Sequence, residues 1–149
     1  MNNIKYWQKK GFIRYAEIFV SDRLLQGVDV NIFDKKLDNK LRKHKKAGVY
    51  LLVDPTTEEV LKVGQSADIR HRINTQYKCI SNSTNNFIRE EIKKRWSRIE
   101  FFVYLVPNKK IELIGHTFKT NFQKGLEEAI LAEYHETYHE IPQLNRQRN

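Results

Sequence analysis

The sequence has few of the residues that support a cross-linked or fibrous protein: one cysteine, three prolines and six glycines in 149 residues. A single thiol, Cys79, forms no internal disulfide and builds no thiolate zinc site, so we expect a protein of the reducing cytoplasm. No apolar run approaches the roughly 18 residues that span a bilayer, and residues 1–10 lack the apolar core of a secretory signal. The remaining composition, 40 % hydrophobic and 30 % charged, predicts a folded domain.

Acidic residues are also in deficit, because 18 Asp and Glu stand against 27 Lys and Arg, a formal net charge of +9. Residues 35–46 contain seven basic side chains and one acid, Asp38, with only Leu37 and Leu41 as apolar positions. Such a segment indicates a polyanionic partner rather than a membrane surface. We expect DNA, although these residues do not distinguish it from RNA. The predicted nucleic-acid contacts are Lys43, Lys45, Lys46, Arg70 and Tyr77.

The chain divides into a basic N-terminal extension, residues 1–46, that packs on the core, and a domain over residues 47–149. The apolar residues of 12–20 fit either a strand or a helix, whereas the spacing in 32–45 predicts a helix. Runs at 48–53 and 60–64, separated by turn residues, predict a β-hairpin. A helix with Ser66 as its N-cap follows, then a helix around 87–96, a buried central strand at 99–106, and a helix after Gly125 that ends near Pro142. These elements predict an α/β fold of the α+β type.

Four pieces of this second domain occur in an order that resembles the GIY-YIG nuclease family. Gly48-Val49-Tyr50 is similar to the first signature triplet, and Lys62-Val63-Gly64 is similar to the second. Arg72 follows eight residues after Gly64, and Glu127 is followed by apolar residues at the third and fourth places. Pro142-Gln143-Leu144-Asn145 is similar to the closing P-x-x-N. The resemblance spans roughly residues 47–146. It implies a small three-stranded antiparallel sheet flanked by helices, and a metal-dependent endonuclease of restriction or mobile-element type.

The resemblance implies a role for each matched residue in hydrolysing a phosphodiester. Tyr50 takes or relays a proton from the attacking water, and Arg72 holds the scissile phosphate through its planar fork of donors. Glu127 binds Mg²⁺ or Mn²⁺, with Glu128 as a rival one residue away. Asn145 hydrogen-bonds near Tyr50 or the metal and holds neighbouring groups of the site in position, without acting as an acid or a base. One active site per chain makes a homodimer possible for cutting both strands.

Two positions depart from the family pattern and leave alternatives open. Lys62 stands where the family usually has a second tyrosine, and we hypothesise that its ammonium lies opposite Tyr50, favours the phenolate form and contacts phosphate. Gln76 stands where the family often has a histidine, with Tyr77 beside it as a partial substitute. These departures support the alternative function, a non-catalytic nucleic-acid-binding module with the same fold.

A second motif, His135-Glu136-Thr137-Tyr138-His139, matches the H-E-x-x-H pattern of zinc proteases. No histidine or aspartate follows it, and Pro142 ends the helix, so the third ligand is missing downstream. A polar helix face is the simpler interpretation.

Overall fold

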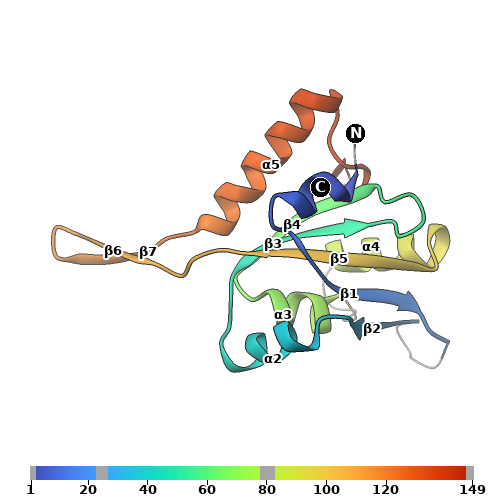
Figure 1. Cartoon of the computed structure of the whole chain (residues 1–149), viewed down its shortest axis with the longest axis horizontal. Helices are drawn as coiled ribbons and strands as arrows, with labels where there is room; N and C mark the ends of the chain where they lie inside the picture. The colour runs from blue at the N-terminus through green and yellow to red at the C-terminus, as the bar shows by residue number, and fades with distance from the viewer. Residues whose placement is uncertain (1–2, 23–26, 78–82, 147–149) are drawn as a thin grey trace.

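The computed structural model describes residues 3–22, 27–77 and 83–146, so Cys79 lies outside the described part of the chain. Its centre is a five-stranded antiparallel sheet of order β2-β1-β5-β3-β4 (Figure 1). The strands are β1 (Ile13–Val20), β2 (Val28–Ile32), β3 (Gly48–Val53), β4 (Val60–Ser66) and β5 (Arg98–Leu105). A separate two-stranded ribbon consists of β6 (Lys110–Leu113) and β7 (His116–Lys119).

Helices surround the sheet on both sides. They are α1 (Ile4–Lys9), α2 (Lys35–Lys43), α3 (Ile69–His71), α4 (Ser83–Arg95) and α5 (Phe122–Tyr138). A π-helical turn, η1 (Arg72–Gln76), continues α3, and a 3₁₀ turn, η2 (Gln143–Arg146), follows α5. The described helices include none that is long and apolar enough to cross a membrane.

The α+β class is confirmed, but the expectation of three strands is wrong. Residues 13–20, which fitted either a strand or a helix, form β1, and β1 pairs with β5 in the same sheet as the predicted hairpin. The N-terminal region therefore supplies two of the five strands, β1 and β2. The strand predicted at 99–106 is central, as expected, because β5 lies between β1 and β3.

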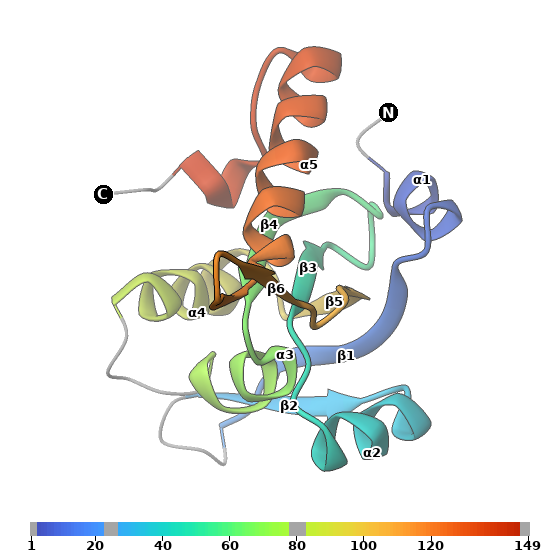
Figure 2. The ribbon, with the colours of Figure 1, turned by 90° about the vertical axis from the view of Figure 1, so that its left-hand side faces the viewer.

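Alternate residues of β3 point to opposite faces of the sheet and divide the core in two. Tyr50 and Leu52 belong to a cluster that α2, α3 and α4 cover, through residues such as Leu41, Ile69 and Ile92. Val49, Leu51 and Val53 belong to a second cluster that α1 and α5 cover. Figure 2 shows these layers, with α1 and α5 above the sheet and α2 and α3 below it.

The helix predicted at 32–45 forms α2, and its one acidic residue after the cap is buried. Asp34 caps the helix by accepting from the Leu37 amide at 2.9 Å. Asp38 is 4 % exposed and accepts from the Tyr15 hydroxyl at 2.6 Å and from Arg70 Nε at 3.1 Å. The Asp38 carboxylate therefore links α2 to β1 and α3 through hydrogen bonds. The basic side chains of α2 face solvent.

The chain crosses the free edge of β4 after α5. Ile130 of α5 packs on one face of the sheet, whereas Leu144 of η2 packs on the other. Between them, buried Asn145 accepts from the Val63 amide at 2.8 Å and donates to the Val63 carbonyl at 2.9 Å. β4 is the edge strand, and in the described part of the chain no other strand pairs with its outer side. The Asn145 side chain takes the place of such a partner at Val63, because it satisfies both backbone hydrogen-bonding groups there, and it ends the sheet at β4.

Two predicted boundaries need correction, and one element was missed. Ser66 is the last residue of β4, and Asp68 caps α3 by accepting from the His71 amide at 3.1 Å. The last helix begins at Phe122, so Gly125 lies inside it and does not precede it. The ribbon of β6 and β7 was not predicted.

Candidate functional site

Tyr50 lies on β3 directly opposite Gly64 of β4, and its ring lies across that glycine. A Cβ atom added at Gly64 would meet Tyr50 Cζ at 2.2 Å and the hydroxyl oxygen at 2.4 Å. Only a residue without a side chain leaves this space, so Gly64 is required for the position of the Tyr50 ring. The ring is fully buried, and its hydroxyl is directed over β4.

Two side chains, one at the start of η1 and one directly after its end, converge on the Tyr50 hydroxyl. The Tyr77 hydroxyl lies 2.9 Å from it, and Arg72 Nη1 donates to it at 3.4 Å. Residues five apart would be about 140° apart around a regular α-helix, too far to reach the same atom. The wider turn, in which the Tyr77 amide bonds to the Arg72 carbonyl at 3.3 Å, brings both side chains to one side.

The Tyr77 hydroxyl keeps its proton more firmly than an exposed tyrosine does. Burial raises the pKa of Tyr77 well above its ordinary value, and the neighbouring Tyr50 adds to the rise. A neutral Tyr77 hydroxyl is therefore available as a donor to the Tyr50 oxygen, alongside Arg72. Two donors aimed at one phenol oxygen stabilise negative charge on that oxygen.

Lys62 lies on the same face of β4 as Gly64, two residues before it. Its strand partner is Leu52, so Gly64, and not Lys62, is opposite Tyr50. The Lys62 ammonium nevertheless lies 5.9 Å from the centroid of the Tyr50 ring. Lys62 and Arg72 are both partly exposed, whereas Tyr50 and Tyr77 are enclosed. Two cations thus lie between the buried phenols and solvent.

Glu127 and Glu128 differ in orientation on α5. Glu127 shares the side of the helix that carries the buried residues Gln123, Ile130 and Tyr134, and it is half-buried; Glu128 is exposed. Because α5 packs against β4 and β3, Glu127 is the carboxylate of the two that faces the sheet. It does so from the face opposite Tyr50.

Asn145 was expected near Tyr50 or a metal. Both side-chain hydrogen bonds found for it go to the backbone of Val63, between Lys62 and Gly64. Its observed role is to hold the strand that carries those two residues. Asn145 therefore positions the site from the edge of the sheet.

The predicted nucleic-acid contacts fall into two groups. Lys43 and Lys45 are exposed and Lys46 is partly exposed, as a surface contact requires. Tyr77 is fully buried against Tyr50 and Phe101, so in this structure it offers no surface for a nucleic-acid contact. Arg70 forms an ion pair with Asp38 at 3.1 Å and is two-thirds buried, which indicates a structural role.

The H-E-x-x-H segment does not form a helical pair of histidines. α5 ends at Tyr138, and His139 has a left-handed backbone with φ of 60°. Within residues 3–22, 27–77 and 83–146, no group of three or more His, Cys, Asp or Glu side chains is arranged to hold a metal ion. Among those residues, a metal that Glu127 holds would therefore have fewer than three such side chains as ligands.

The fold is similar to that of two DNA endonucleases of known structure. One is restriction endonuclease HPY188I in complex with product DNA, with a TM-score of 0.59 and 18 % identity over 100 % of this chain and 87 % of that chain. The other is a mutant of bacteriophage T4 EndoII, with a TM-score of 0.63 and 16 % identity over 90 % of this chain and 95 % of that one. No protein-family model matches the sequence, and no curated protein has a similar sequence. At these identities the similarity shows a shared fold.

Sequence reasoning missed two parts of this site. Tyr77 was named only as a partial substitute for a histidine and as a nucleic-acid contact, because nothing in residues 72–77 signals the π-helical turn that brings it beside Arg72. Gly64 was noted only as part of a triplet, although its lack of a side chain is what admits the Tyr50 ring.

Proposed function

We propose that this protein is a metal-dependent endonuclease that hydrolyses phosphodiester bonds in DNA by a GIY-YIG-type mechanism. The observation that carries the proposal is the convergence of Tyr77 and Arg72 on the Tyr50 hydroxyl. The shared fold with two DNA endonucleases and the net charge of +9 support the same function.

In this mechanism Arg72 and Lys62 bind the scissile phosphate, because they are the partly exposed cations of the cluster. The Tyr50 phenolate takes the proton of the attacking water, or relays it, so that hydroxide attacks phosphorus as the bond to the leaving oxygen breaks. The donors Tyr77 and Arg72 stabilise the phenolate before that transfer. Since Tyr50 is fully buried, substrate binding must draw Arg72 toward the phosphate and open a path to the phenol.

Glu127 is the residue that would hold Mg²⁺ or Mn²⁺. Glu127 is half-buried and faces the sheet from the side opposite Tyr50, so an ion that it held would reach the phosphate bound by Arg72 and Lys62 only around the edge of β4. A single carboxylate would suit an ion that keeps several waters. When bound, the ion neutralises charge on the phosphate and on the leaving oxygen. Exposed Glu128 provides the matched control, since it has the same charge on the other side of the helix.

The test is plasmid nicking with purified protein, in Mg²⁺ or in EDTA. Wild type and Glu128→Gln should convert supercoiled DNA to nicked and linear forms only with metal, whereas Tyr50→Phe, Arg72→Ala and Glu127→Gln should not. Loss of activity in Glu128→Gln but not in Glu127→Gln would contradict the assignment of the carboxylate.

The second candidate function is a non-catalytic DNA-binding module with the same fold. The burial of Tyr50 favours it, because a phenol without contact to solvent cannot reach water in this conformation. DNA that wild type binds but never cuts, over a range of sequences and metals, would establish this alternative.

A further inference from the structure

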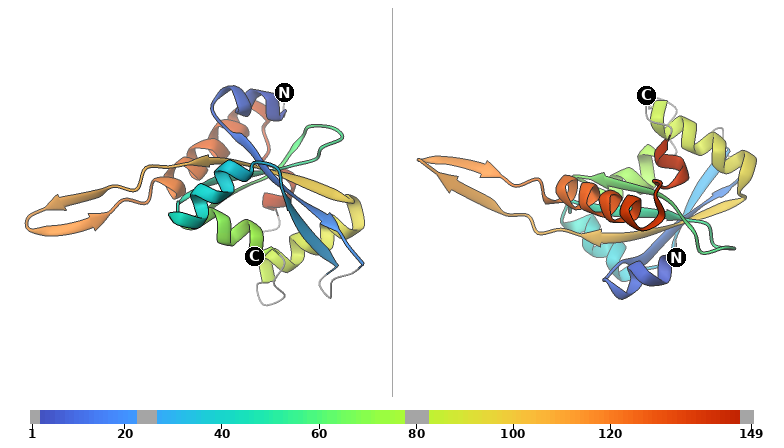
Figure 3. Two further views of the ribbon diagram at one scale, coloured as in Figure 1. Left: turned by 60° about the horizontal axis from the view of Figure 1, so that its bottom comes forward. Right: turned by 90° about the horizontal axis from the view of Figure 1, so that it is seen from above.

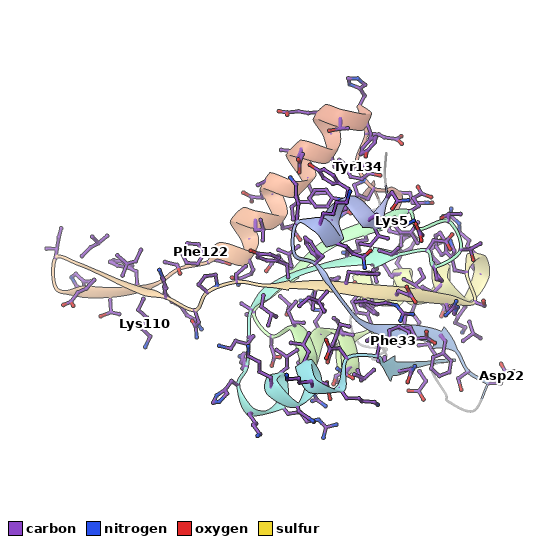
Figure 4. All side chains as sticks on the ribbon, in the orientation of Figure 1. Lys5, Asp22, Phe33, Lys110, Phe122 and Tyr134 are labelled. Atoms are coloured by element: carbon purple, nitrogen blue, oxygen red, sulfur yellow. The ribbon has the colours of Figure 1, made fainter. Side chains whose placement is uncertain are left out.

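The ribbon of β6 and β7, with its connections to β5 and α5, forms an arm over residues 107–121 that extends away from the sheet (Figures 1 and 3). Every residue of both strands is exposed. Figure 4 shows the arm's side chains projecting from its two faces, with Lys110 near its base and Phe122 where α5 begins. A two-stranded ribbon without further packing is marginally stable in water, so this arm needs a covering surface.

The two faces of the arm differ in chemistry. The ladder pairs Ile111 with Phe118 and Leu113 with His116, which places these four side chains on one face. The other face carries Lys110, Glu112, Thr117 and Lys119. The apolar side chains are 46 % exposed at Ile111, 58 % at Leu113 and 52 % at Phe118. An apolar face of this kind is typical of a protein contact, while the charged face stays in water.

The tip of the arm is a strained and exposed apolar residue. Ile114 is 98 % exposed and has φ of 52°, followed by Gly115 with φ of 74°. A two-residue hairpin with positive φ at both places favours Asn-Gly, and a β-branched residue there is a genuine outlier. Nothing in the described chain compensates for this strain, which is explained if the isoleucine side chain binds a partner.

A complementary groove lies at the base of the same arm. It has a volume of about 420 Å³ and is lined by Tyr104, Val106, Pro107, Phe122, Gly125 and Leu126, with Asn121 as its polar residue. The tip cannot enter the groove of its own chain, because three ladder steps of about 3.4 Å keep it at least about 10 Å from the arm's base. The apolar tip and the apolar groove therefore suit two molecules.

We propose that two copies of this chain pair through their arms, antiparallel and related by a two-fold axis. Each Ile114 enters the partner's groove beside Gly125, and the apolar faces of the two arms meet between the two tips. In each copy the groove and Ile114 lie one arm length apart, at the base and the tip of the arm. Two antiparallel arms therefore bring each tip to the partner's groove at the same time, so the arrangement is self-complementary. It would bury on the order of 1,000 Å² in total, at the low end for a specific interface, which suits a weak, concentration-dependent dimer.

The test is the molar mass of the protein by sedimentation velocity, without DNA or metal, at rising protein concentration in about 0.5 M NaCl. High salt screens the repulsion between two basic chains and removes bound nucleic acid. Wild type should move from monomer to dimer. Ile114→Asn should weaken the dimer at least about tenfold while relieving backbone strain, so its fold remains intact.

The groove has its own matched pair of variants. A side chain at Gly125 has open space, so Gly125→Phe should fill the groove and abolish the dimer, whereas Gly125→Ala should leave it unchanged. Glu112→Gln, on the arm's charged face, is a second control that should dimerise as wild type does. In a Cys79→Ser background, Ile114→Cys combined with Gly125→Cys should give a covalent dimer on mild oxidation.

A wild type that stays monomeric throughout, or a dimer that Ile114→Asn and Gly125→Phe leave unchanged, would overturn the proposal. A wild type that stays monomeric, and whose affinity for DNA in a separate binding measurement falls in Ile114→Asn, would instead make the arm a DNA contact. Because the sedimentation measurements contain neither DNA nor metal, a protein that dimerises but cuts no DNA would refute the proposed nuclease function and leave the arm pairing in place.

Discussion

The Tyr77 hydroxyl lies 2.9 Å from the Tyr50 hydroxyl, although the two residues come from a π-helical turn and a strand 27 positions apart. Their rings meet edge to face, with centroids 5.9 Å apart, and Phe101 packs against both. This geometry fixes the phenol pair inside the core and leaves Arg72 and Lys62 to face solvent. A phosphate group can therefore approach Arg72 and Lys62 from solvent, while Phe101 and the core keep the two phenol rings in place.

Tyr77→Phe removes the neutral donor to Tyr50 and leaves Arg72 as the donor to that oxygen. We expect cleavage to slow about tenfold, with the loss in kcat and with the rising limb of the pH–rate profile moved to higher pH. The free energy of unfolding should fall by about 1 kcal/mol, the value of one hydrogen bond. Tyr138→Phe on α5 is the control. An unchanged pH profile would show that Tyr77 has only a packing role.

Gly64→Ala and Gly125→Ala should change stability in opposite directions. The first adds a carbon at 2.2 Å from the Tyr50 ring, so the ring or the strand must move, and we expect a loss of about 3 kcal/mol. The second adds a carbon in open space inside α5, where alanine favours the helix by about 1 kcal/mol. Urea denaturation of both variants measures the difference. A stable Gly64→Ala protein would mean that the Tyr50 ring does not need this space.

Asn145→Ala should release the edge of β4. The Val63 amide loses its acceptor and the Val63 carbonyl loses its donor, both in a buried place, and we expect a cost of about 3 kcal/mol. Amide hydrogen exchange at Val63 should accelerate at least about tenfold, while Asn108→Ala in an exposed loop should leave it unchanged. Full protection of Val63 in Asn145→Ala would contradict the assigned role.

Asp38 makes stability depend on pH in the acid range. Burial alone would raise the pKa of this carboxyl, but the Tyr15 hydroxyl and the Arg70 guanidinium outweigh it and hold the pKa below its ordinary value. A depressed pKa in the folded state adds stability above the unfolded value, about 4, and that stability is lost as pH falls through the folded value.

Comparison with Asp38→Asn isolates this contribution. Near pH 7 the variant should be less stable than wild type by about 3 kcal/mol, because Arg70 and Arg42 lose their buried partner. The difference should shrink as pH falls below about 4. Denaturant titrations at pH 7 and pH 3 measure it, and a constant difference would contradict the depressed pKa.

Lys43 and Lys45 should contribute to DNA affinity through phosphate contacts. Each contact releases counterions, so the double variant Lys43→Ala, Lys45→Ala should lower the slope of log affinity against log salt by about 2. Affinity should fall for every sequence alike, because phosphate contacts do not distinguish bases. Lys5→Ala, which removes one charge from α1, is a control. An unchanged slope would place the DNA elsewhere.

The sequence by itself determined the local elements and the chemistry that they carry. Turn residues at 54–57 between two β-branched runs predicted the hairpin of β3 and β4, and the charge balance predicted a polyanionic partner. The apolar spacing after Glu127 favoured that carboxylate over Glu128, and the structure places it on the sheet-facing side. These properties depend on residues close together in the chain, so local patterns contain them.

Only the tertiary structure decided which of these pieces meet. β1 joins the sheet by pairing with β5, some 85 residues away, and no local pattern distinguishes such a strand from an extension. Tyr77 reaches Tyr50 because a helix widens at one turn, and Asn145 reaches Val63 because the chain crosses the edge of β4. Long-range pairing and the filling of space set these contacts. They arise only when the whole chain is packed, and the proposed site exists because of them.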